Sequence, residues 1–115
     1  MQAVPLTRNN DFRRLYKRGK SLVDRNIVVY YAKNRLGANR VGFTVTTRLG
    51  HAVTRNRVRR RLREIYRLHE TELCRGAELV VVARSRSVTA AYSDLERDFL
   101  RACRKLSLTR EETAQ

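Results

Sequence analysis

The amino-acid sequence predicts an α+β fold in which helices pack on a single sheet of about four strands. Segments with apolar residues at helical spacing alternate along the chain with short runs rich in Val, Ile and Tyr, which are typical of strands. The 115 residues, 42% of them hydrophobic, are enough for one domain with one modest core. We expect the element order α-β-β-α-β-α, an ordered core over about residues 6–107 and a loose C-terminal tail from Leu108.

The first helix is predicted from about Asn10 to Arg18, with Asn9 or Asn10 as its N-cap and Gly19 at its end. Three apolar residues define its buried face and lie at i, i+3 and i+4 among basic neighbours: Phe12, Leu15 and Tyr16. A possible short extra strand follows near residues 21–23.

Two strands are predicted next. Residues 26–33 contain the run Ile-Val-Val-Tyr-Tyr, which indicates a strand buried on both faces, or covered on one of them by a ligand. Residues 41–46 alternate between apolar residues and Gly or Thr, which predicts a half-buried antiparallel strand. Residues 34–39, with Gly37, are predicted to form a hairpin loop between the two strands.

The second helix is predicted from Thr54 as N-cap to about Glu72. Arginines on its surface stand four residues apart, and like charges at this spacing destabilise a helix by about 0.2–0.5 kcal/mol per pair. We therefore expect an external anion to offset the repulsion. The buried stripe is expected to consist of Val58, Leu62, Ile65, Tyr66 and His69.

A continuous apolar run at residues 79–83, after Gly76, predicts a central strand that is parallel to a neighbour. Ser93 followed by Glu96 three residues later has the spacing of a capping box. A last helix is therefore predicted from Ser93 to about Leu106.

The charge of the chain indicates a polyanionic partner. Lys and Arg number 26 against 11 Asp and Glu, which gives a net charge of +15 and a pI near 11.3. Neither a run of about 20 apolar residues, as a membrane-spanning helix needs, nor a secretory signal is visible. We therefore expect nucleic acid rather than a membrane as the partner. Cys74 and Cys103 lack the spacing of a zinc site, and they suit a reduced cytoplasmic protein.

Five segments, in order, resemble the bacterial ribonuclease P protein family over about residues 6–107. Its signature is an Arg-Asn-Arg helix start, here residues 55–57, preceded by a Gly-Phe-Thr-Val strand, here residues 42–45. Residues 6–16 resemble the family's first helix, residues 50–53 its connection into the arginine-rich helix, and residues 79–84 its following strand.

The resemblance implies the fold of a domain found in a small-subunit ribosomal protein. In this fold a left-handed crossover joins the second and third strands through the arginine-rich helix, whereas general rules favour the right-handed form in about 98% of cases. The resemblance also implies the function. The chain would be the protein subunit of a ribonucleoprotein endoribonuclease, with no catalytic residue of its own. It would bind the catalytic RNA 1:1 and help to remove the 5′ leader of precursor tRNA, in the cytoplasm. The Mg²⁺ of the holoenzyme would be bound mainly by RNA, and no metal stably by the protein alone.

Two sets of site residues follow from the resemblance. The first set would contact the catalytic RNA, and the second would line a cleft for the single-stranded leader. Aromatic side chains in a basic groove are also what unpaired nucleotides require on physical grounds. The first set is Arg48, Arg55, Asn56, Arg57, Arg59, Arg60 and Arg63, and the second is Phe12, Tyr16, Val28 and Tyr30.

Three alternatives rank lower. A self-sufficient nuclease needs clustered carboxylates or a placed histidine, and the acids here are scattered along the sequence. A general RNA-binding protein, such as a ribosomal protein, shares the size and charge but not the ordered motifs. A DNA-binding helix-turn-helix protein needs a short helix just before the arginine-rich one, and none is predicted.

Overall fold

Five strands form one mixed sheet, in the spatial order β1-β4-β5-β3-β2. The structure is a computed structural model, and it describes residues 1–110. Single 3-10 turns span Thr47–Leu49, Glu70–Glu72 and Ser85–Val88. The strands and α-helices are β1 (Val4–Pro5), α1 (Asn9–Arg18), β2 (Lys20–Val23), β3 (Ile27–Lys33), β4 (Arg40–Thr44), α2 (Ala52–His69), β5 (Ala77–Ala83) and α3 (Tyr92–Lys105). The α+β class is confirmed.

Strand β5 is the centre of the sheet. It pairs antiparallel with β3 and parallel with β4, so Val81 has Val29 on one side and Phe43 on the other. Every residue of β5 is buried except Val82, which is half-buried. The continuous apolar run thus reflects a strand covered on both faces, and the predicted central strand with a parallel neighbour is confirmed.

The predicted hairpin between residues 26–33 and 41–46 is wrong. Strands β3 and β4 follow each other in the sequence, but β5 lies between them in the sheet. Strand β4 is parallel to both of its neighbours, β1 and β5, and not antiparallel as predicted. Alternation along a strand reports which face is buried, and it carries no information about the direction of the neighbouring strand.

The sheet has one strand more than the expected number of about four. The possible strand near residues 21–23 is confirmed as β2, whereas β1 has only two residues and was not predicted. Val4 N–H donates to the carbonyl of Asn39, and Leu6 N–H to that of Val41, both at 2.9 Å. Pro5 has no N–H and lies between these two donors on the edge strand, where a proline costs no ladder bond.

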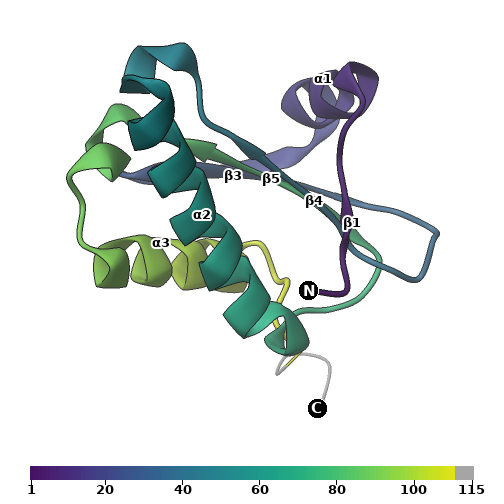
Figure 1. Cartoon of the computed structure of the whole chain (residues 1–115). Helices are drawn as coiled ribbons and strands as arrows, with labels where there is room; N and C mark the ends of the chain where they lie inside the picture. Colours follow the sequence, from purple (N-terminus) through teal and green to yellow (C-terminus); the bar gives the residue numbers. More distant parts are fainter. Residues whose placement is uncertain (111–115) are drawn as a thin grey trace.

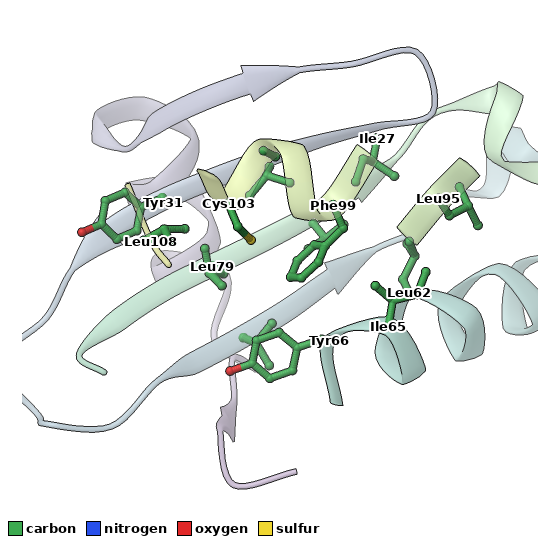
Figure 2. Close-up of a cluster of buried hydrophobic side chains, with 14 of the residues drawn as sticks. Ile27, Tyr31, Leu62, Ile65, Tyr66, Leu79, Leu95, Phe99, Cys103 and Leu108 are labelled. Carbon is green, nitrogen blue, oxygen red and sulfur yellow. The ribbon is translucent and has the colours of Figure 1, made fainter. Parts of the chain in front are cut away.

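Helices α2 and α3 cover one face of the sheet, and α1 lies on the other (Figure 1). The larger core fills the space under α2 and α3, where the predicted stripe of α2 packs against alternate residues of β3 and β5. Figure 2 shows part of this core, with Phe99 of α3 between Leu79 and the α2 residues Ile65 and Tyr66. His69 of the predicted stripe is only half-buried.

The three helices begin earlier than their predicted caps. Arg8, His51 and Ala91 occupy the N-cap positions, and none of them makes a side-chain capping bond. Thr54 and Ser93 lie inside their helices instead, so both cap predictions are wrong, as is the cap at Asn9 or Asn10. A cap contributes only about 1 kcal/mol, so a capping residue alone does not fix where a helix starts.

Packing extends beyond both predicted limits of the core. Ala3 and Leu108 are buried, and the carbonyl of Leu108 accepts a 2.7 Å hydrogen bond from the N–H of Cys74. Thr109 forms a β-bridge with Leu73. The remainder of the predicted tail, residues 111–115, lies outside the described residues.

Candidate RNA-binding site

Helix α1 forms one wall of the candidate site, and it sits on the sheet through few apolar contacts. Leu15 is fully buried and forms a small second core with Leu6 and Val80 of β5. Phe12 lies over Gly42 of β4, where a Cβ atom would come within 2.7 Å of the ring. Gly42 therefore lets the helix approach the sheet closely, because any side chain there would displace Phe12.

Four charged residues fix α1 on the sheet. Asp11 and Arg14 of α1 face Arg40 of β4 and Glu78 of β5, and each guanidinium contacts both carboxylates. Arg40 donates to Asp11 at 2.8 Å and to Glu78 at 3.0 Å, whereas Arg14 contacts Asp11 at 3.3 Å. The carboxylates are buried. Closed ionic networks of this kind favour one orientation over others, because every alternative leaves a buried charge unpaired.

The aromatic residues of α1 meet β3 and β4 on the other side of the helix. The ring centroids of Tyr16 and Tyr30 are 4.9 Å apart in an edge-to-face arrangement, and those of Phe12 and Tyr16 are 6.4 Å apart. The hydroxyl of Tyr16 forms a 2.7 Å hydrogen bond with that of Thr44. Tyr16 remains 40% exposed, so it is held in place while one side of its ring stays open to solvent.

A groove of about 550 Å³ joins this aromatic cluster to helix α2. Three predicted site residues line it: Phe12 and Tyr16 from α1, and Arg59 from α2. Tyr30 contacts Tyr16 from β3 without lining the groove, and Val28 lies half-buried on β3 opposite Val82. Residues from the two predicted sets, one for the leader and one for the catalytic RNA, therefore share one groove.

The sequence analysis did not single out several residues that line the groove. Thr44 anchors Tyr16, and Arg13 adds a cation from α1. Thr44 stands at the polar position of an alternating strand, and only the crossing of α1 over β4 gives it a role, which no local pattern reveals. The residues missed are Asn9, Arg13, Phe43, Thr44 and Val45.

The remaining predicted RNA contacts project from the exposed side of α2 and from the turn before it. Arg59 donates to Asn56 at 3.1 Å, and Arg55 to the carbonyl of Gly50 at 3.2 Å. In residues 1–110 no carboxylate lies within ion-pair distance of any predicted arginine contact. Arg55 and Arg59 are half-buried, and the exposed members of the set are Arg48, Asn56, Arg57, Arg60 and Arg63.

The acidic residues are engaged elsewhere. Every carboxylate among residues 1–110 accepts a bond from a cation or a backbone N–H outside the predicted RNA contacts. Glu64 pairs with Arg67, whose guanidinium lowers the pKa of that carboxyl. Glu70 accepts the N–H groups of Gln2 and Ala3, which lower its pKa against the effect of burial. The start of α2 is thus left positively charged.

His69, at the end of α2, is bonded through both ring nitrogens. Its Nε2 lies 2.7 Å from Glu96 of α3, and its Nδ1 contacts Glu72. Burial alone would lower the pKa of His69, but the two carboxylates raise it above the ordinary value. Burial also raises the pKa of the Cys103 thiol to about 12. Among residues 1–110, no three His, Cys, Asp or Glu side chains form a group that could hold a metal ion.

Comparison with known proteins agrees with this geometry. A family model described as Ribonuclease P matches residues 2–107. The chain belongs to the ribonuclease P protein family. The ribonuclease P protein component of Natranaerobius thermophilus is 41% identical over 107 residues, which are 93% of each chain.

Solved ribonuclease P proteins share the fold. The Staphylococcus aureus protein superimposes with a TM-score of 0.85 at 28% identity, covering 94% of this chain and 99% of its own. The Thermotoga maritima protein gives 0.77 at 29% identity, covering 84% and 92%. The resemblance seen in the sequence is confirmed, and membership makes the chain a subunit of an endoribonuclease of tRNA processing. No helix in the described part of the chain is long and apolar enough to cross a membrane.

Proposed function

We propose that this chain is the RNA-binding subunit of ribonuclease P, which places α2 against the catalytic RNA and holds the 5′ leader of precursor tRNA between α1 and the sheet. One observation carries the proposal: a single groove is lined by the aromatic residues Phe12 and Tyr16 and by Arg59 of the arginine-rich helix. In this position the leader would lie next to the surface that binds the catalytic RNA.

The leader side of the groove is suited to stacking. Unpaired bases stack on exposed aromatic rings with about 1–3 kcal/mol per base, largely independent of sequence. Tyr16 is held at its edge by Tyr30 and at its hydroxyl by Thr44, so its ring needs little ordering when a base arrives. Arg13 supplies a cation for the phosphates between stacked bases.

The α2 side is suited to a folded RNA. Arginines without a carboxylate partner neutralise backbone phosphates and release counterions, which makes binding strongly dependent on salt. The guanidinium fork also fits phosphate oxygens in pairs. The proposed contacts are Arg48, Arg55, Asn56, Arg57, Arg59, Arg60 and Arg63.

In this proposal the catalytic centre is in the RNA, and the chain contributes binding and orientation. Mg²⁺, held mainly by RNA, would supply charge stabilisation and an activated water. Phosphates of the leader and of the catalytic RNA repel each other where they meet, and arginines at that junction reduce the repulsion. We further propose a 1:1 complex that acts in the cytoplasm, where the free thiols Cys74 and Cys103 would stay reduced.

Reconstitution tests the proposal. The protein is mixed with a bacterial ribonuclease P RNA at low Mg²⁺, and cleavage of precursor tRNA is compared with that by RNA alone and protein alone. Only the mixture should cut efficiently at the mature 5′ end. A mixture no better than RNA alone would leave a general RNA-binding protein as the better account.

A pair of variants tests the leader groove. Tyr16→Ala should weaken binding of precursor tRNA and leave mature tRNA affinity unchanged, because mature tRNA has no leader. Tyr16→Phe keeps the ring and loses only the hydroxyl, so it should retain most of the affinity. Equal losses for precursor and mature tRNA would contradict the assignment.

A further inference from the structure

A second basic hollow lies at the edge of the sheet, between the C-terminal end of α1 and the residues that follow α3. Its volume is about 550 Å³, and it is lined by Arg18, Lys20, Lys33, Tyr31, Leu106 and Ser107, among others. Lys20 is the direct cross-strand neighbour of Tyr31, and Lys33 follows two positions later on the same side of β3. We propose that this hollow binds backbone phosphates of single-stranded RNA.

The charges around the hollow are unbalanced. Arg18, Lys20 and Lys33 converge on it, no carboxylate is among its lining residues, and none of the three is ion-paired within residues 1–110. A cation near a helix C-terminus is favourable in itself, which accounts for Arg18 in the last turn of α1 and for Arg104 and Lys105 in the last turn of α3. Lys20 and Lys33 lie on strands and have no such reason to be there, and the three cations around the hollow repel one another unless an anion enters it.

Tyr31 adds a hydrogen-bond donor to the cations. Its ring is buried at the edge of the core, next to Leu108, and its hydroxyl points away from the cluster (Figure 2). Burial raises the pKa of Tyr31, so the hydroxyl stays protonated and able to donate. It has no hydrogen-bond partner among residues 1–110. A phosphate oxygen in the hollow would meet a neutral donor as well as ammonium and guanidinium groups.

The kind of cation indicates the kind of phosphate. The chain has only four lysines among its 26 basic residues, and two of them, Lys20 and Lys33, line this hollow. Lysine is a point charge on a flexible stem, without the planar fork that fixes an arginine on one phosphate. Such a site suits a backbone whose phosphates have no fixed position, as in an unpaired strand.

The position of the hollow identifies the strand as the distal part of the leader, an inference that rests on the proposed function. Strand β2 begins with Lys20 at the hollow and ends with Val23, which pairs with Val28 on the face that carries α1. Val23 is 64% exposed, and it lies roughly 10 Å from Lys20 along β2. A leader that leaves the groove across Val28 and Val23 therefore reaches the hollow by rounding the edge at β2.

The test is a double substitution that removes two positive charges, Lys20→Gln/Lys33→Gln, in the full protein reconstituted with catalytic RNA. The matched control is Arg35→Gln/Arg75→Gln, which removes two exposed cations that line neither the groove nor the hollow. Precursor affinity is measured against salt with a long leader and with a short leader that ends inside the groove. Each phosphate that a protein neutralises on a single strand adds about 0.7 to the slope of log affinity against log salt. Loss of two lysine contacts should therefore lower this slope by about 1.4 for the long leader.

With the short leader, and in assembly with the catalytic RNA alone, the lysine variant should match the wild type. A loss of slope in assembly itself would assign the hollow to the catalytic RNA and overturn the leader assignment. A lysine variant identical to the arginine control in every arm would overturn the site. Failure of the proposed function is distinct, because the wild-type mixture would then cleave no better than the RNA alone.

Discussion

The substitution Gly42→Ala should destabilise the protein, because the added methyl group has no room under α1. The new Cβ would lie 2.7 Å and 2.8 Å from two carbons of the Phe12 ring and 3.2 Å from Cβ of Leu6. Carbon atoms pack at about 3.5–4.0 Å, so the ring has to retreat by roughly 1 Å. Leu6 leads directly into α1 and restricts that movement. Overpacking of this size costs about 1–3 kcal/mol.

Urea unfolding of the free protein measures the effect, as a lower midpoint with an unchanged slope. The double variant Gly42→Ala/Phe12→Leu should recover most of the loss, because the shorter side chain vacates the space that the methyl group enters. Affinity for precursor tRNA should remain low in both variants, since Phe12 is displaced in one and absent in the other. A Gly42→Ala protein with wild-type stability and precursor affinity would refute the reasoning.

Other predictions concern charges. Glu78→Gln should lower the free energy of unfolding, measured with urea, by about 2 kcal/mol, because the carboxylate is only 5% exposed and holds two guanidinium groups. Arg14→Gln should lower it by at most about 1 kcal/mol, because the Arg14 side chain is 46% exposed. Equal losses would contradict the role of burial. The protonated His69 ring stabilises the folded protein fully below its ordinary pKa of 6.5, and this stabilisation is lost as the pH rises through the raised pKa. Urea unfolding at several pH values should show this pH-dependent part of the stability in the wild type and not in His69→Gln. Arg59→Ala should lower the salt slope of assembly with catalytic RNA by about 0.9, and Arg61→Ala, whose guanidinium is bonded to the carbonyl of Ala90, should leave that slope unchanged.

Periodicity predicted the parts of the fold in which one residue pattern has one structural meaning. The stripe of Val58, Leu62, Ile65 and Tyr66 on α2 is buried as predicted, and the run in β5 is central. Strand neighbours could not be predicted in this way. Whether β3 pairs with β4 or with β5 depends on α2 carrying the chain back over the sheet, and the residues of β3 look the same in both cases.

The candidate site was predictable to a similar extent. The resemblance named Phe12, Tyr16 and Arg59, but nothing in the sequence indicated that the three line one groove. That result depends on α1 crossing β4, which in turn depends on the absence of a side chain at Gly42 and on the ionic contacts of Arg40. Each of these residues is ordinary in its local context, and only the assembled sheet shows its role.

The position of β5 between β3 and β4 has a consequence for folding kinetics. Of the strand pairs, only β2 with β3 is local in sequence, whereas every pairing of β5 closes a loop of more than thirty residues. Loops of that length raise the contact order and slow the search for the native sheet. During synthesis, β3 and β4 have no shared partner until β5 leaves the ribosome. We therefore expect the chain to fold in one late step, with α1 docking only after the three strands beneath it have joined.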